Sequence, residues 1–118
     1  MITKQKIVDR MEAYRARLGA LMERVKRYPE ILHVGNSQYK LSYGDTYVSV
    51  EENGILDMYV SFKLNEFADA RVENVESLIA FKDAIENSER AIKNIHNMLD
   101  KYDIDKARIL LELDDFFN

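Results

Sequence analysis

A stripe of apolar residues at heptad spacing near the start of the chain constrains the fold more than any other feature. From Thr3 to Tyr28 there is no proline and a single glycine, and apolar positions recur at alternating intervals of four and three residues. These positions are Ile7, Met11, Tyr14, Leu18, Leu21, Val25 and Tyr28. The spacing predicts a long helix with a narrow contact stripe that ends at Pro29. At 1.5 Å per residue it is about 38 Å long, so it spans a domain of this size or projects from it.

A second stripe with the same spacing follows later in the chain. Asn74 is a suitable N-cap, and the segment from there to Tyr102 contains neither glycine nor proline. The stripe positions are Leu78, Phe81, Ile85, Ser88, Ile92, Ile95, Leu99 and Tyr102. Ser88 is their single polar member. We therefore expect a second long helix that pairs with the first through the two stripes, and self-association between chains is the alternative.

The last segment predicts a separate short helix. Asp103-Ile104-Asp105 interrupts the stripe, and either aspartate can cap a helix from Lys106 to Phe117. This helix is apolar on nearly all sides, and such a helix needs cover on more than one side. We expect it to dock against the sheet of the same chain. Burial by a partner is the alternative.

Between Pro29 and Phe67 the apolar period changes to two, which is typical of β-strands. Alternating runs around 38–43, 47–51 and 56–64 are separated by the turn signals Gly44-Asp45 and Asn53-Gly54. We read them as three antiparallel strands in a meander.

The length of the loop at Asn53-Gly54 determines the predicted pairing register of the two strands on either side of it. A two-residue turn at Asn53-Gly54 places the valines of one strand and the apolar residues of the next on opposite faces. A three-residue loop over 52–54, with Gly54 in a left-handed bulge position, repairs this. It also places Tyr47 opposite Tyr59 on the outer face. The tyrosines then act either as a pair that supports the sheet or as anchors for a partner.

We expect the 118 residues to form one domain, 1–118, of the α+β class. Its expected order is a long N-terminal helix, a three-stranded antiparallel β-meander, a long second helix and a short C-terminal helix. In architecture alone, this order is similar to prefoldin-like and secretion-chaperone-like subunits. No sequence motif ties the chain to either family.

The residues that carry chemistry are sparse. There is no cysteine, and the two histidines, His33 and His96, lack the companions that a metal site needs. Asp100, four residues after His96, favours a structural ion pair instead. The segment 35–40 lacks the glycine and the following helix of a phosphate loop. We expect no enzyme activity, no cofactor and no metal.

Charge is divided unequally along the chain. The net charge of −4 combines residues 1–29, with eight basic and three acidic side chains, and a remainder with 9 basic and 18 acidic ones. Arg10, Arg17 and Arg24 recur every seven residues beside the first stripe. We expect them to pair with acids on a partner helix. A row of cations for nucleic-acid phosphates is the alternative.

These patterns favour a non-catalytic protein-binding module, such as an inhibitor, an adaptor or a small chaperone-like subunit. It would act through its helical stripes and outer sheet face, on a protein partner or a second copy in a homodimer. The candidate contact residues are Arg10, Arg17, Arg24, Tyr47 and Tyr59. The alternative is nucleic-acid binding through the basic first helix, with an acidic DNA mimic less favoured. No apolar run is long enough for a membrane span, so we expect no membrane partner and a cytoplasmic location.

Overall fold

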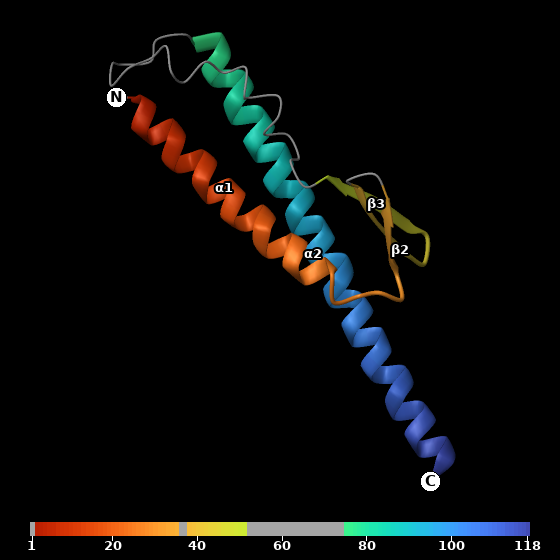
Figure 1. Ribbon diagram of the computed structural model, residues 1–118. Coiled ribbons are helices and arrows are strands. Elements are labelled where there is room, and N and C mark those ends of the chain that lie inside the picture. The colour runs from red at the N-terminus through yellow and green to blue at the C-terminus, as the bar shows by residue number, and fades with distance from the viewer. Residues whose placement is uncertain (1, 36–37, 52–74) are drawn as a thin grey trace.

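The computed structural model describes residues 2–35, 38–51 and 75–118, with the side chain of Glu51 excepted. Its elements are α1 (Lys4–Val25), β1 (Leu32–Gly35), β2 (Gln38–Tyr43), β3 (Thr46–Glu51) and α2 (Val75–Phe117). A helix, a three-stranded antiparallel sheet and a long helix follow one another, as in Figure 1. The α+β class predicted from the sequence is therefore confirmed.

The first helix begins and ends for local reasons. The Thr3 side chain accepts a hydrogen bond from the backbone N–H of Lys6 at 3.3 Å, which satisfies one of the free donors at the helix start. The helix ends at Val25, three residues before the predicted end. Pro29 disfavours the helical conformation for the residue before it, and the chain passes through turns to β1. All seven stripe positions are nevertheless buried.

The second helix is one continuous element of 43 residues, so the predicted break at Asp103-Ile104-Asp105 is wrong. Neither aspartate turns back to cap a new helix. Asp103 instead accepts hydrogen bonds from Arg24 and Tyr28, and Asp105 accepts from Tyr43 and Arg108. These partners hold both carboxylates away from the backbone, and no proline or glycine stops the helix. The expected cap residue Asn74 lies outside the described residues.

The sheet is a meander in the order β1-β2-β3. β2 and β3 match two of the expected strands, and Gly44-Asp45 joins them in a two-residue turn with Gly44 at φ 58°. β1 was not expected, and it pairs with β2 from Leu32↔Leu41 to Gly35↔Gln38. The expected strand at 56–64, the loop at 52–54 and the Tyr47–Tyr59 pair fall outside the described residues.

α1 and α2 run side by side in the same direction, and the sheet lies beside the middle of α2 (Figure 1). One core cluster joins the stripe of α1, the matching face of α2 and the inner face of the sheet. Leu21, Leu41 and Leu99 are fully enclosed in it, one from each layer. The molecule measures 69 × 30 × 21 Å, and its long axis is set by α2, whose 43 residues extend about 65 Å.

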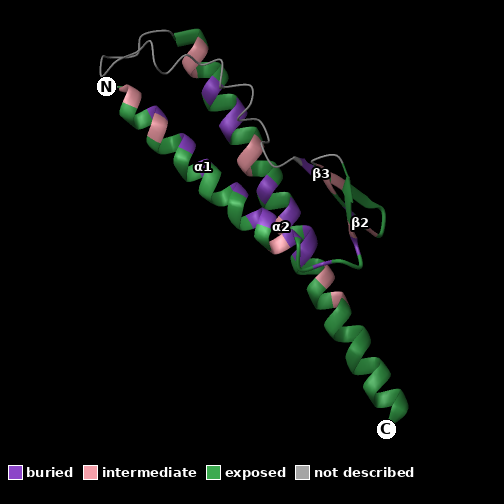
Figure 2. Ribbon diagram, in the orientation of Figure 1, coloured by how far each residue is buried: buried purple, intermediate pink, exposed green. Residues whose placement is uncertain are grey.

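The last third of α2 extends beyond both α1 and the sheet (Figure 2). From Ile104 to Phe117 the large apolar side chains are exposed, including Phe116 at 78% and Phe117 at 80%. The expected docking of this segment against the sheet is therefore wrong. The continuous helix is the reason, because without a turn after Tyr102 the segment cannot fold back.

Candidate functional site

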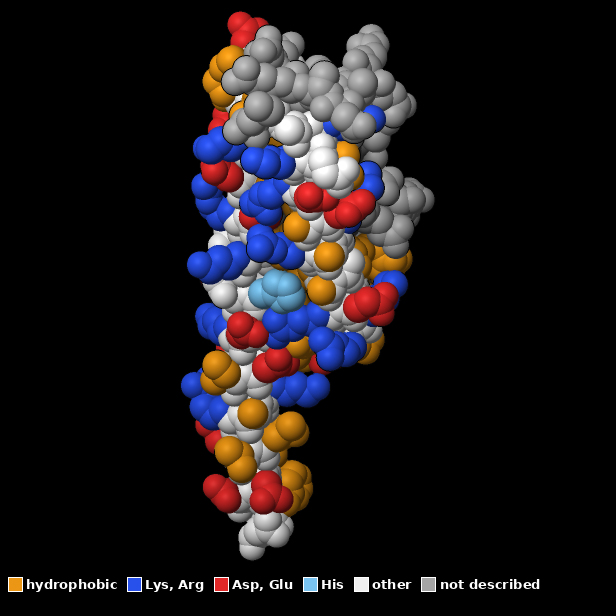
Figure 3. Space-filling view, turned by 90° about the vertical axis from the view of Figure 1, so that its left-hand side faces the viewer, with side chains coloured by type: hydrophobic (Ala, Val, Ile, Leu, Met, Phe, Trp, Pro, Cys, Tyr) orange, Lys and Arg blue, Asp and Glu red, His pale blue; other side chains and the backbone are white. Residues whose placement is uncertain are grey.

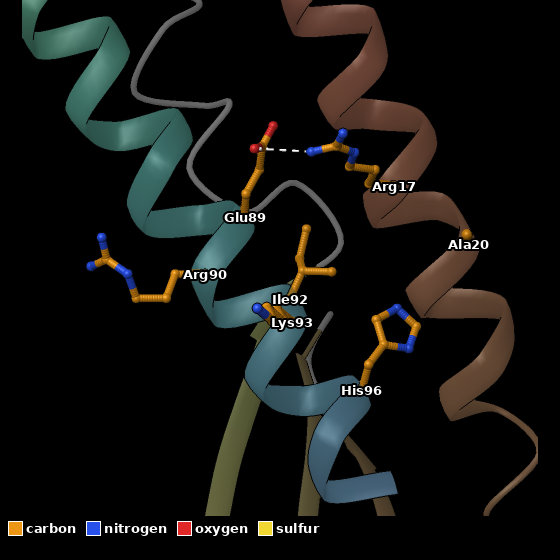
Figure 4. Close-up of a pocket in the computed structure, with 7 residues that line it drawn as sticks. All are labelled: Arg17, Ala20, Glu89, Arg90, Ile92, Lys93 and His96. Atoms are coloured by element: carbon orange, nitrogen blue, oxygen red, sulfur yellow. Dashed lines mark ion pairs between the residues drawn. The ribbon is translucent and has the colours of Figure 1, made fainter. Parts of the chain in front are cut away.

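The arginines of α1 face carboxylates of α2. Arg10 Nη1 lies 2.6 Å from Glu89 Oε1, and Arg17 Nη1 lies 2.9 Å from Glu89 Oε2, the pair drawn in Figure 4. The Glu89 side chain is only 17% exposed. A carboxylate that is mostly removed from water needs such partners. Two arginines one heptad apart therefore converge on one half-buried acid.

Arg24 makes the densest set of contacts. Its Nη2 lies 2.7 Å from Asp100 and 3.2 Å from Asp103, and its Nη1 donates to His96 Nδ1 at 2.9 Å. A guanidinium can only donate, so His96 Nδ1 is the acceptor and this ring is neutral. Burial and the neighbouring Arg24 lower the pKa of His96, in agreement with a neutral ring. The expected His96–Asp100 ion pair is replaced by two contacts to the same arginine.

Three tyrosines close the core where α1 ends. The Tyr102 ring meets Tyr28 at a centroid distance of 5.6 Å and Tyr43 at 5.1 Å, both edge to face. The Tyr43 hydroxyl donates to Asp105. The Tyr102 hydroxyl donates to Glu30 in the turn after α1. This cluster joins the connection after α1 to β2 and α2 at one level of the molecule.

The same cluster shifts the titration of its polar groups. The hydrogen bond from Tyr102 lowers the pKa of Glu30 to about 2, and Lys106, at 3.2 Å from Glu30, adds to the effect. The hydrogen bond to Glu30 raises the pKa of Tyr102 to about 12. Both groups are near the surface, and hydrogen bonding is the largest cause of both shifts. Because Glu30 and Tyr102 are far apart in sequence, this contact forms only in the folded chain.

An open groove of about 600 Å³ lies between α1 and α2. Its lining residues are Arg17, Ala20, Glu89, Arg90, Ile92, Lys93 and His96. In Figure 4 the Arg90 side chain points away from α1, and Arg17 is turned toward Glu89. No group of three or more His, Asp or Glu side chains in the described ranges is arranged to hold a metal. The groove therefore combines basic side chains, Arg17, Arg90 and Lys93, with the apolar Ala20 and Ile92.

The free end of α2, residues 104–117, presents a continuous apolar face. Its members are Ile109, Leu110, Leu113, Phe116 and Phe117, which are between 48% and 80% exposed. Their spacing of 1, 3, 3 and 1 places all five on one side of a helix. A surface of this kind marks an interaction site more often than a single exposed side chain does.

The sequence-predicted contact residues lie on different surfaces. Arg10, Arg17 and Arg24 line the α1–α2 junction, whereas Tyr47 is 60% exposed on β3, opposite Ser42 of β2. Tyr59 lies outside the described residues. The structure thus brings the three arginines together along α2 and places Tyr47 on the sheet, apart from them.

Sequence reasoning missed the acids that receive the arginines. Glu89 and Asp103 are separated by two heptads on α2, the same separation as Arg10 and Arg24 on α1. That matching interval is a signal that a search for cross-helix charge pairs finds. Two members of the tyrosine cluster, Tyr28 and Tyr102, are the last positions of the two predicted stripes, whereas Tyr43 of β2 has no signal that ties it to them.

No helix among the described residues meets the length and apolarity that a membrane crossing requires. Comparison with protein-family models, with curated proteins and with solved structures finds no match to this chain.

Proposed function

We propose that this chain is a non-catalytic protein-binding module whose main contact surface is the free end of α2. The observation that carries the proposal is the exposed apolar face of Ile109, Leu110, Leu113, Phe116 and Phe117. Removing such side chains from water contributes roughly 1.5–3 kcal/mol each when burial is complete. Burial of these exposed side chains against a partner therefore provides a favourable free energy of binding.

The contact surface differs in detail from the one that the sequence suggests. The stripe positions between Phe81 and Leu99 are covered within the chain, apart from the half-buried Ser88, so they offer little surface to a partner. Tyr47 on the sheet remains exposed and supplies a second, smaller candidate contact. Adaptors, inhibitors and small chaperone-like subunits all act through surfaces of this kind, and the proposal covers the three.

Affinity capture from the native host with three matched baits tests the proposal. The baits are the natural chain, Leu113→Glu on the apolar face and Leu111→Glu on the other side of the same helix. We expect one protein at comparable molar amount with the natural chain and with Leu111→Glu, and its loss with Leu113→Glu. The captured protein is then purified and its binding to the three chains is measured directly. Equal recovery by all three baits would refute the role of this face.

Nucleic-acid binding through α1 is the second candidate, and the distribution of cations favours it. Residues 1–29 hold eight basic and three acidic side chains. Figure 3 shows many Lys and Arg side chains on one face of the molecule, above the free end of α2. Arg10, Arg17 and Arg24 already contact carboxylates, so phosphates would have to displace those contacts.

A salt titration of binding to duplex and single-stranded DNA tests this candidate. Replacing Arg10, Arg17 and Arg24 by Gln is expected to reduce the salt slope by about one for each lost phosphate contact. Absence of binding at about 50 mM salt, where electrostatic binding is strong, rejects it.

A further inference from the structure

We propose that the partner of the free end of α2 is an amphipathic helix of another protein whose apolar stripe is flanked by lysine and arginine. This inference rests on the proposed function and adds the chemical class of the partner. In the complex the partner helix continues the line of α1, on the same face of α2, beyond the point where α1 ends.

The first argument is the continuity of the apolar face. The 3-4 spacing of α2 runs on past its covered part, through Leu99, Tyr102, Ile109, Leu113 and Phe116, with the charged Lys106 at the one position between Tyr102 and Ile109. α2 is unbroken over this length, so the free apolar face follows the covered one without rotation beyond the usual drift. α1 ends at Val25, and the turn at Pro29 takes the chain away toward β1. The free face is therefore the extension of an interface that already exists.

The second argument is the chemistry of that existing interface. α1 supplies an apolar stripe and three flanking arginines, and α2 supplies the facing stripe and the acids Glu89, Asp100 and Asp103. α1 is thus a segment that α2 already binds, and its properties indicate what the free end of α2 can bind. It is a basic amphipathic helix that runs in the same direction as α2 (Figure 1).

The third argument is the charge along the free end. Glu112 and Asp114 are the immediate neighbours of Leu113, about 100° to either side of it on the helix. Within the described ranges, neither of these carboxylates nor that of Asp115 has an ion-pair partner. The cations of this segment are already engaged, since Lys106 lies 3.2 Å from Glu30 and Arg108 lies 3.2 Å from Asp105. Figure 3 shows acidic and apolar side chains together at this end. An apolar face between two free acids matches a partner with basic flanks.

Charge also decides against a second copy of this chain. Pairing two free ends brings together two segments that each hold four acids and two bases over residues 104–118. Glu112 and Asp114 flank the centre of the face, so self-pairing places like charges beside each other.

Fluorescence anisotropy with two synthetic peptides tests the inference on the full chain. Both peptides have 18 residues with leucine at heptad a and d positions. One carries lysine and arginine beside the leucines, and the other carries glutamate at those positions. We expect the basic peptide to bind at least tenfold more tightly at 100 mM NaCl. Leu113→Glu should weaken its binding at least tenfold, and Leu111→Glu less than twofold.

The matched variants separate this mode from unspecific attraction. Both substitutions add one negative charge, so attraction by charge alone predicts slightly tighter binding of the basic peptide to both. A double variant, Glu112→Lys with Asp114→Lys, should shift the preference toward the acidic peptide. Circular dichroism of each variant confirms that the fold is retained.

Three outcomes would overturn the inference. They are equal affinity for the two peptides, equal effects of Leu113→Glu and Leu111→Glu, and a natural chain that sediments as a dimer while Leu113→Glu sediments as a monomer. The last would identify a second copy as the occupant. If the capture experiment succeeds while the peptides fail to discriminate, the protein-binding function stands and only the partner class is wrong.

Discussion

The two parts of α2 carry the same pattern and meet different surroundings. Between Leu78 and Tyr102 its apolar face is covered by α1 and the sheet, and between Ile104 and Phe117 the same face is in water. The 3-4 spacing persists across the boundary, where the charged Lys106 takes the one stripe position between Tyr102 and Ile109. The boundary is set by α1, which stops at Val25 before Pro29. An apolar stripe therefore predicts which face of a helix is suited to burial. How much of that face is buried within the chain depends on another element, here the length of α1.

The largest expected difference is between two leucines of the one helix. Leu99 is fully buried, and Leu113 is 48% exposed. Leu99→Ala should lower the free energy of unfolding by about 2–5 kcal/mol, because it leaves a cavity in the core. Leu113→Ala should change it by less than about 0.5 kcal/mol. Urea unfolding of both variants measures this contrast. A comparable loss at Leu113 would mean that the free end is covered in the isolated chain.

The carboxylates of the two parts provide the next contrast. Glu89→Gln removes the charge that two arginines share, and we expect a loss of about 1–2 kcal/mol in the free energy of unfolding, discounted for partial exposure. Glu112→Gln changes a free carboxylate and should have no measurable effect in the same urea experiment. A neutral result for Glu89→Gln would show that the arginine contacts contribute only to the orientation of the helices.

Backbone propensity sharpens the comparison further. Ala84 is buried against the core, and Ala107 is exposed in the free end. Glycine costs about 1 kcal/mol relative to alanine within a helix. For Ala84→Gly this cost should appear in the global free energy of unfolding. For Ala107→Gly it should appear as local fraying, seen as faster amide hydrogen exchange after residue 104, with global stability nearly unchanged. Equal global losses would contradict an independent free end.

The periodic parts of the structure were predictable from the sequence. The buried faces of α1 and of most of α2 could be predicted from each helix alone, because the apolar spacing repeats often enough in each to specify one face. β1 was missed because it has only four residues, and a single alternating pair, Leu32 and Val34, is too short a signal to separate a strand from a connection. Val34 is 67% exposed, so this strand is held mainly by backbone pairing with β2.

The fate of the last segment depended on tertiary contacts. Asp103 and Asp105 are equally suited to capping a helix and to accepting side-chain hydrogen bonds. Arg24 and Tyr43, which lie far away in sequence, decide between these roles. The apolar face of this segment could be predicted from the residue spacing. Its exposure to solvent could not, because exposure depends on where α1 ends and on the continuity of α2.

The smallest expected effect lies at the boundary between the two parts, where Glu30 accepts a hydrogen bond from Tyr102 and lies 3.2 Å from Lys106. These contacts lower the pKa of Glu30 to about 2 from an ordinary value of 4.5. A carboxylate with a lowered pKa in the folded state binds fewer protons than in the unfolded state. It therefore stabilises the fold above pH 4.5, and this contribution is lost as the pH falls from 4.5 toward 2.

Urea midpoints measured between pH 6 and pH 2 test this contribution. Replacing Glu30 by Gln should flatten the loss of stability in that window, and Tyr102→Phe should do so in part, because it removes the first cause of the shift. Both variants should match the natural chain most closely at the acid end. The effect is small because the carboxylate lies at the surface, where solvent screens it. Identical pH profiles for Glu30→Gln and the natural chain would mean that the link between the turn after α1 and α2 does not form in solution, and the boundary of the covered part would then lie closer to Leu99.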